Sequence, residues 1–289
     1  MSATPAAASA RLWREALGRL WRNRLAAASL VVLGLVVLAC VLGPWLAPVP
    51  GEALDFEHIA APPGLDSGHW FGTDNVGRDL LARTLEGGRL SLLVGLVATL
   101  VSVVIGVAWG AVAGYSGGRV DALLMRAVDI LYALPFMFLV ILLMVLFGRH
   151  FVLVFVAIGA INWLDMARIV RGQTLSLKRR EFVDAGRLAG LPPLAIIRRH
   201  IVPNLLGVVV VCATLTVPQV ILVESFLSFL GLGVQEPATS WGVLVNDGAG
   251  DMEVAPWALL FPAGFLATTL LCLNFLGDGL RDALDPHER

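Results

Sequence analysis

Lysine is almost absent from this sequence, since Lys178 is the only one among its 289 residues. A phosphate-binding loop of the G-x-x-x-x-G-K-S/T type needs a lysine in a glycine-rich turn, and the sequence contains no such motif. Paired carboxylates, Ser/His/Asp sets and H-E-x-x-H patterns that would suggest catalysis do not stand out either. We therefore expect a chain that is not an enzyme, with no catalytic residues and no ATPase site of its own.

Cysteine and histidine are also sparse and form no recognisable ligand pattern. Cys40, Cys212 and Cys272 lie inside apolar runs, where a thiol is expected to pack as a small hydrophobic group. The five histidines are scattered without metal-ligand spacing: His58, His69, His150, His200 and His287. The sequence therefore predicts no disulfide, no metal site and no cofactor in this chain.

Charged residues make up only 15% of the chain, whereas hydrophobic residues make up 57%. A soluble domain of this size is far less apolar, so the composition indicates an integral membrane protein whose first partner is the lipid bilayer. The net charge of −1 carries little information, because the location of the charges matters more than their sum. No nucleic-acid partner is expected.

Six apolar runs are long enough to cross a hydrocarbon core of about 30 Å at about 1.5 Å per residue. The spans are predicted at 25–46, 90–114, 123–148, 151–170, 205–230 and 257–276. With this assignment, the basic residues outside the cytoplasm are only Arg78, Arg83, Arg89 and Arg149. The positive-inside rule then places both termini in the cytoplasm. The predicted fold class is an all-α membrane protein with six transmembrane helices.

Polar residues mark the third and fourth predicted spans. Arg126 and Asp129 lie three positions apart and could pair on one face of the third span, which Pro135 is expected to kink. Asp165 and Arg168 weaken the fourth span. We keep that span because without it the basic loop that follows would fall outside the cytoplasm.

The fifth predicted span contains a single acid, Glu224. A charged carboxylate is costly in hydrocarbon, so this side chain should face protein, water or a partner helix, or be protonated. A packing role and a role in a transport pathway remain equally open.

Between the spans, residues 1–24 are expected to form a cytoplasmic N-terminal segment and 47–89 a polar external segment. Within 47–89, a turn and cap around Thr73–Asn75 should precede a short interfacial helix. Its apolar side comprises Leu80, Leu81, Thr84 and Leu85, and Gly87 and Gly88 should end it. A plain capped surface helix is the alternative. Residues 281–289 form a cytoplasmic tail.

The loop 172–204, between the fourth and fifth spans, is the longest polar and basic interruption in the second half of the chain. A short helix is predicted over Ser176–Ala189, with Phe182, Gly186 and Ala189 on one side. Gly190 should end it, and Pro192 or Pro193 should begin a second helix that runs through Arg199.

Four small residues, Ala185, Gly186, Ala189 and Gly190, lie close together in this loop and would let another surface approach the backbone. The loop could instead be a solvated segment whose arginines follow the positive-inside rule. That reading explains the arginines but does not explain the small residues or the turn.

The same loop resembles the cytoplasmic loop of the integral-membrane permease subunits of ATP-binding-cassette (ABC) importers. That family carries Glu-Ala-Ala, three residues, Gly, nine residues, then Ile-x-Leu-Pro. The matching positions are Asp184, Ala185, Gly186, Gly190, His200, Val202 and Pro203. The spacing is kept in full, with Asp, Gly, His and Val as four departures. The resemblance implies that Asp184, Ala185, Gly186, Gly190 and Pro203 belong to a coupling helix that contacts an ATPase.

Three further stretches are similar to the oligopeptide and dipeptide branch of this family, in its C-type permease subunit. They are the pattern G-T-D-x-x-G-R-D at Gly72–Asp79, RHIVPN at 199–204 and ESFLSFLGLG at 224–233. The cytoplasmic tail resembles that branch too. Residues 90–280 are thereby expected to form the importer transmembrane domain, with five of the six spans.

The resemblance implies a bacterial inner-membrane complex in which this chain lines half of the pathway. Its partners would be a second, B-type permease, two ATP-binding subunits that hold ATP and Mg²⁺, and an external or periplasmic solute-binding protein. Related permeases serve nickel or glutathione, so these substrates remain alternatives to peptides. An ion-coupled secondary transporter is the alternative from another class, although such proteins usually carry more ionisable residues within their spans. A membrane scaffold without transport is a further rival.

Overall fold

The computed structural model describes residues 17–147 and 151–284. Within these ranges the chain forms helices and connecting turns without a strand, apart from one isolated bridge between Thr73 and Asp79. The all-α fold class is confirmed. Most of the predicted N-terminal segment, the end of the third span and the last part of the tail lie outside the described residues.

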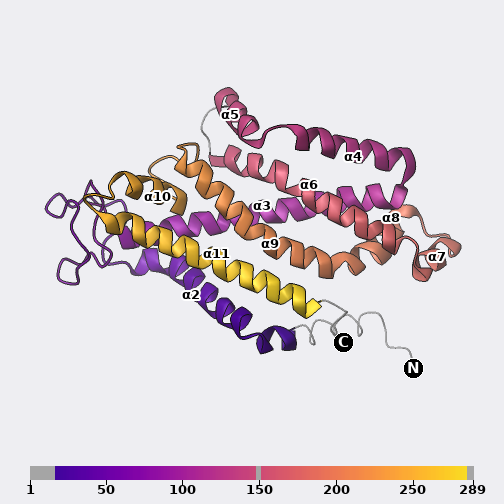
Figure 1. Ribbon diagram of the computed structural model, residues 1–289, viewed down its shortest axis with the longest axis horizontal. Helices are drawn as coiled ribbons and strands as arrows, with labels where there is room; N and C mark the ends of the chain where they lie inside the picture. Colours follow the sequence, from indigo (N-terminus) through magenta and orange to yellow (C-terminus); the bar gives the residue numbers. More distant parts are fainter. Residues whose placement is uncertain (1–16, 148–150, 285–289) are drawn as a thin grey trace. The chain divides into compact units, whose positions relative to one another are not determined.

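Figure 1 shows the helices in chain order. They are α2 (Arg24–Leu46), α3 (Leu80–Ser116), α4 (Gly118–Ala133), α5 (Phe136–Phe147), α6 (Phe151–Leu177), α7 (Glu181–Leu188), α8 (Pro193–Ile196), the π-helical turn η1 (Ile197–Ile201), α9 (Val202–Phe229), α10 (Trp241–Gly250) and α11 (Pro256–Leu284). Within the described parts of the chain, four stretches are long and apolar enough to cross a membrane: Arg24–Trp45, Leu80–Ser116, Pro193–Phe229 and Pro256–Leu284.

The predicted third span is broken rather than kinked. α4 has 16 residues and α5 has 12, so they extend for only about 24 Å and 18 Å. The break falls at Leu134, whose backbone is extended because the following Pro135 disfavours helical angles there. The fourth span lies within α6, which runs through Leu177 as one helix. Four of the six predicted spans therefore meet the length and hydropathy expected for a membrane crossing.

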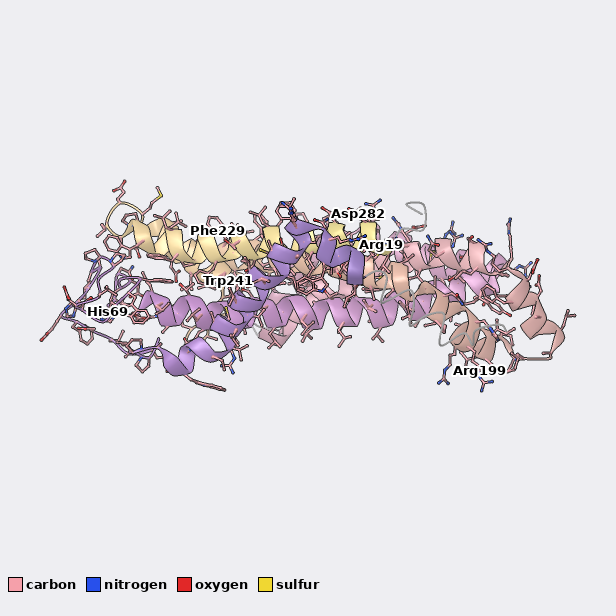
Figure 2. All side chains as sticks on the ribbon, turned by 90° about the horizontal axis from the view of Figure 1, so that it is seen from below. Arg19, His69, Arg199, Phe229, Trp241 and Asp282 are labelled. Carbon is pink, nitrogen blue, oxygen red and sulfur yellow. The ribbon has the colours of Figure 1, made fainter. Side chains whose placement is uncertain are left out.

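The described chain divides into two compact units, and α3 and α9 each contribute to both. The first unit contains residues up to Leu93 and from Ser225 onward. In this unit α11 packs beside α2 and α10 (Figure 1). Near the C-terminal end of α11, the Arg19 guanidinium donates to the Ala283 carbonyl at 3.5 Å, and Figure 2 shows Arg19 close to Asp282.

Trp241, at the start of α10, is fully buried and fixes the centre of the first unit. Its indole N–H donates to the Thr84 carbonyl at 2.9 Å, and its backbone N–H donates to Ser91 Oγ at 3.2 Å. Cys40 and Leu85 complete the same apolar cluster. Cys40 is thus a buried packing residue, as expected.

Gly87 and Gly88 do not end a separate interfacial helix, so that prediction is wrong. α3 continues through both glycines to Ser116. A Cβ at Gly88 would lie 2.5 Å from both Cys40 Sγ and Trp241 Cζ2, so the glycine serves close packing. The helix start was also misplaced, because Asp79 caps α3 by accepting from the Ala82 N–H at 2.8 Å.

The second unit contains Val94–Glu224, and within it α3 and α6 lie in close contact. Gly106, Gly110 and Gly114 repeat every fourth position along α3 and face α6. A Cβ would come within 2.6 Å of Met166 at Gly106, and within 2.7 Å of Thr174 at Gly114. Small residues at this spacing let two helices approach to backbone contact.

α4 packs beside α6 through ion pairs (Figure 1). Arg171 donates from Nε and Nη2 to the two Asp121 carboxylate oxygens at 2.6 and 2.7 Å, and these bonds hold the pKa of Asp121 below its ordinary value. Asp129 accepts from Arg168 of α6 at 2.8 Å rather than pairing with Arg126 as predicted, because the carboxylate has a charged donor on the packed neighbouring helix. The Tyr132 hydroxyl donates to Asp165 at 2.9 Å, so both charged residues that weaken the fourth span, Asp165 and Arg168, have partners on α4.

We predict that Gly110→Ala destabilises the second unit by about 1–3 kcal/mol, because a methyl group there meets the backbone of Ala167 and Arg171, which cannot move aside. The measurement is the thermal unfolding transition of the purified protein in detergent. Gly34→Ala is the matched control: it makes the same change inside α2, where no atom lies within 4 Å. The control should be neutral or more stable by up to about 1 kcal/mol. Equal transitions for both variants would contradict the close helix contact.

Candidate functional site

The loop after α6 folds into the predicted helix, sharp turn, helix element. Gly190 follows α7 with φ +74°, the left-handed conformation expected of a glycine that ends a helix. Its N–H donates to the Arg187 carbonyl at 3.0 Å, and the Leu191 N–H reaches back to the Gly186 carbonyl at 3.1 Å. These bonds satisfy carbonyl groups at the end of α7.

Pro192 and Pro193 begin the second helix as predicted. Pro192 is extended with ψ 153°, and Pro193 occupies the first helical turn, where its missing N–H costs nothing. The helix does not stop after Arg199, however. It continues through the π-helical turn η1 into α9, so the second short helix is the beginning of a long one.

Pro203 accounts for the π-helical turn. A proline inside an α-helix clashes with the carbonyl four residues earlier, which here belongs to Arg199. The Val202 N–H instead bonds the Ile197 carbonyl, one residue further back than in an α-helix. The Asn204 amide donates to the His200 carbonyl at 2.7 Å and satisfies a group in the same turn.

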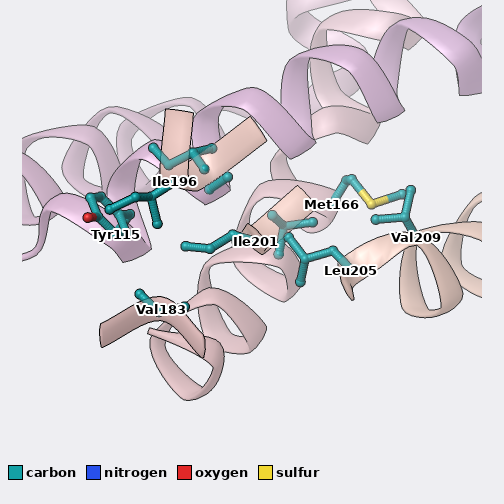
Figure 3. Packing of buried hydrophobic residues seen from close by; sticks show 10 residues of the cluster. Tyr115, Met166, Val183, Ile196, Ile201, Leu205 and Val209 are labelled. Atoms are coloured by element: carbon teal, nitrogen blue, oxygen red, sulfur yellow. The ribbon is translucent and has the colours of Figure 1, made fainter. Parts of the chain in front are cut away.

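One side of α7 is anchored in the largest apolar cluster of the second unit. Val183 is fully buried there beside Tyr115 of α3 and Ile196 of α8 (Figure 3). Met166, Ile201, Leu205 and Val209 continue the cluster along α6, η1 and α9. α7 is therefore fixed to the ends of three long helices.

The predicted inner face of α7 is partly wrong. The structure buries Val183 and Gly186, whereas Phe182 and Ala189 are exposed. α7 begins only at Glu181, after a turn, and the packing of Val183 then sets which side faces the cluster. A Cβ at Gly186 would lie 3.5 Å from the His200 ring, which is ordinary contact.

The outer side of the element carries the other predicted residues. Asp184, Ala185 and Gly190 are exposed, and so is Pro203 at the start of α9. Leu188 and Leu194, on either side of the turn, are 91% and 64% exposed. Sequence reasoning missed these two leucines, although apolar residues flanking a glycine turn in a basic loop were a usable signal. Exposed leucines beside small residues make a surface suited to a partner.

Charged side chains lie beside this surface and leave it exposed. Arg187 donates to Asp184 at 2.9 Å, an exposed pair of a kind that contributes only about 0–1 kcal/mol. The Arg187 guanidinium and the Lys178 ammonium both lie over the Tyr115 ring, at 5.5 and 5.7 Å from its centroid. A hydrogen bond with Tyr115 raises the pKa of Arg187, which stays charged. Asp184 can exchange its weak partner for another cation at little cost.

Glu224, the acid predicted deep in the fifth span, lies in α9 and is fully buried. Burial agrees with the argument that a carboxylate should be shielded from hydrocarbon. A role in packing or in a pathway stays a prediction.

These features together define a multi-pass, all-helical membrane protein with a small exposed helical turn that packs against α3, α6 and α9. The profile of the family described as "Binding-protein-dependent transport system inner membrane component" matches residues 106–289. A second profile, the "N-terminal TM domain of oligopeptide transport permease C", matches residues 11–63. The chain belongs to the family of binding-protein-dependent transport system inner membrane components.

Curated relatives align over almost the whole chain. An oligopeptide transport system permease protein OppC from Escherichia coli K12 is 58% identical over 96% of this chain and 92% of its own length. The OppC protein of Haemophilus influenzae is 56% identical, with coverage of 96% and 89%. A dipeptide transport system permease protein DppC from Bacillus subtilis is 47% identical, with coverage of 96% and 86%.

We predict that Gly190→Ala loosens the end of α7, because a side chain in the left-handed region costs about 1–2 kcal/mol. No atom lies within 4 Å of that Cβ, so strain alone is tested. Gly186→Ala is the matched control and should tighten α7 by up to about 1 kcal/mol through better helix propensity. Hydrogen exchange of the amides of 181–191 measures both effects. Faster exchange in Gly186→Ala than in Gly190→Ala would contradict the geometry.

Proposed function

We propose that this chain is a permease subunit of an ABC importer that takes oligopeptides or dipeptides into the bacterial cytoplasm. The observation that carries the proposal is the alignment of 96% of the chain with the oligopeptide permeases, at 56–58% identity. The dipeptide permease at 47% identity supports the same substrate class. This chain would line half of the pathway.

The energy for transport would come from partners. We propose a complex with a B-type permease, two ATP-binding subunits that hold ATP and Mg²⁺, and an external solute-binding protein. The family description names a binding-protein-dependent system, and the sequence has no G-x-x-x-x-G-K-S/T loop of its own. Both observations support a transport subunit whose ATPase lies on other chains.

The α7 element is the proposed contact with an ATPase subunit. Its outer side offers Asp184, Ala185, Leu188 and Gly190 to a partner, while Val183 on the inner side is packed among α3, α6 and α9. A movement of the ATPase against the outer side of α7 would displace those helices as well, because close-packed interiors deform little. Closure of the ATPase could thereby be passed to the pathway.

Six crossings with cytoplasmic termini remain our proposal for the topology. α4 with α5 and α6 would supply the two crossings that are short or carry charges, and the Arg168–Asp129 pair would reduce the cost of burying those charges. In this topology α7 lies in the cytoplasm and the polar segment 47–79 lies outside.

The topology predicts opposite labelling of two highly exposed positions. In a variant without Cys40, Cys212 and Cys272, a single cysteine replaces either Leu65, which is 81% exposed, or Leu188, which is 91% exposed. A membrane-impermeant thiol reagent should label position 65 from the periplasmic side and reach position 188 only after the membrane is opened. Labelling of position 188 from outside would reject the topology.

The coupling role predicts that Gly190→Arg and Leu188→Asp insert normally yet lose at least about tenfold in peptide uptake, because bulk or charge on the outer side of α7 blocks docking. Membrane level, co-purification of the ATPase and peptide uptake are measured on the same preparations. Leu65→Asp, another exposed leucine changed to a charge, should keep all three. Normal uptake by both α7 variants would refute α7 as the contact. Uptake that depends on an ion gradient and persists without ATP would instead favour a secondary transporter.

A further inference from the structure

Two histidines and a carboxylate that are far apart in the sequence meet in the polar segment before α3. Asp55 Oδ2 lies 2.9 Å from His58 Nδ1 and 3.4 Å from His69 Nε2, and the three atoms all lie within 4.8 Å of one another. Figure 2 shows His69 among the loops that precede α3. Among the described residues, this is the one group of histidine, cysteine and acidic side chains with the spacing to hold a metal ion.

His69 is held rigidly from its other ring nitrogen. Its Nδ1 lies 2.9 Å from Asp79 Oδ1, and both side chains are only 2% exposed. The second oxygen of Asp79 accepts from the Ala82 N–H, so the carboxylate is fixed by the first turn of α3. A carboxylate behind a histidine is the common outer partner of a metal-binding imidazole.

This arrangement leaves two acceptors facing each other. A carboxylate only accepts, so the His69 Nδ1 must carry the proton that it donates to Asp79. In the neutral ring, Nε2 then presents a lone pair to Asp55 Oδ2 at 3.4 Å. Such a contact is repulsive unless a cation lies between the two atoms. The cation is either a second proton on His69 or a metal ion.

The spacing of the three groups can accommodate a metal ion after small side-chain movements. Ligands at about 2.0–2.2 Å from a tetrahedral zinc ion lie about 3.3 Å apart, close to the 3.4 Å between Asp55 and His69. His58 Nδ1, 2.9 Å from the same Asp55 oxygen, offers a third donor, and a small outward movement of its side chain would give it the spacing of a zinc ligand. The His58 and Asp55 side chains are 40% and 34% exposed, so an ion can enter and a fourth position stays open to solvent.

The backbone around these ligands is constrained before any ion binds. The Asp55 N–H donates to the Gly77 carbonyl at 3.0 Å, and Gly77 has φ +83°. The Thr73 hydroxyl donates to the His58 carbonyl and accepts from the Ala61 N–H. Chain segments that carry the ligands are thus already in place, which lowers the entropic cost of binding.

We propose that Asp55, His58 and His69 bind one divalent transition-metal ion of the zinc type, with Asp79 orienting His69 from behind. Imidazole and carboxylate ligands in this ratio suit Zn²⁺ better than Ca²⁺ or Mg²⁺, which prefer oxygen alone. Three protein ligands leave one position for water or for a group from another molecule. The site would tie the loop around Asp55 to the start of α3, and it is independent of transport by the complex.

The test uses the full-length chain, purified in detergent without a polyhistidine tag, stripped with EDTA and dialysed against Zn²⁺. Metal analysis should find one bound ion per chain. His58→Ala and Asp55→Asn, both near the surface, should keep the helical circular dichroism and weaken Zn²⁺ binding by more than the roughly 10–100-fold that loss of an outer partner causes. Asp66→Asn, in the same segment, and His200→Ala, in η1, are the controls and should bind as the unaltered chain does.

X-ray absorption of the zinc-loaded chain gives a second readout. We expect nitrogen and oxygen ligands at about 2.0–2.2 Å with an imidazole signal that falls in His58→Ala. A chain that binds no Zn²⁺, or whose binding survives both His58→Ala and Asp55→Asn, overturns the proposal. Neither result would affect the proposed transport function, which is measured by peptide uptake.

Discussion

The contact between α3 and α6 is the constraint on which the rest of the second unit depends. Gly106, Gly110 and Gly114 bring the two backbones together, and the ends of the same helices supply Tyr115 and the turn that leads into α7. A methyl group on any of these glycines would push α6 away and move the cluster that receives Val183. The position of the exposed element is therefore decided along the helices beneath it rather than within the loop itself.

The same arrangement explains how a small surface element can be both firmly held and available. The side of α7 with Val183 and Gly186 is buried, whereas Leu188 and its neighbours lie in solvent. Burying a side chain such as Val183 contributes about 1.5–3 kcal/mol, more than the exposed Asp184–Arg187 pair can. Attachment is thus apolar and specific, and the outer face is free to match a partner.

Much of this could be read from the sequence, because some residues permit few conformations. The Gly190 turn and the start of the second helix at the proline pair were predictable from allowed backbone angles alone. Packing could not be predicted in the same way. The sequence suggested that Gly88 ends a helix, whereas the structure shows that it makes room for Cys40 and Trp241. The grouping of Asp55 with two histidines could not be predicted either, because the folding of the loop brings His69 to the other two residues and no short sequence spacing indicates it.

The π-helical turn restricts the number of residues that can connect α7 to α9. Each residue of an α-helix advances about 100° around the axis, so one extra residue in a turn rotates everything before it relative to everything after. Ile196 and Ile201, five positions apart, would point in different directions on a regular helix, yet both are buried in one cluster. The turn thus rotates the residues before it about the helix axis, so that the buried sides of α8 and α9 face the same cluster. This connection can vary in its side chains but not in its number of residues.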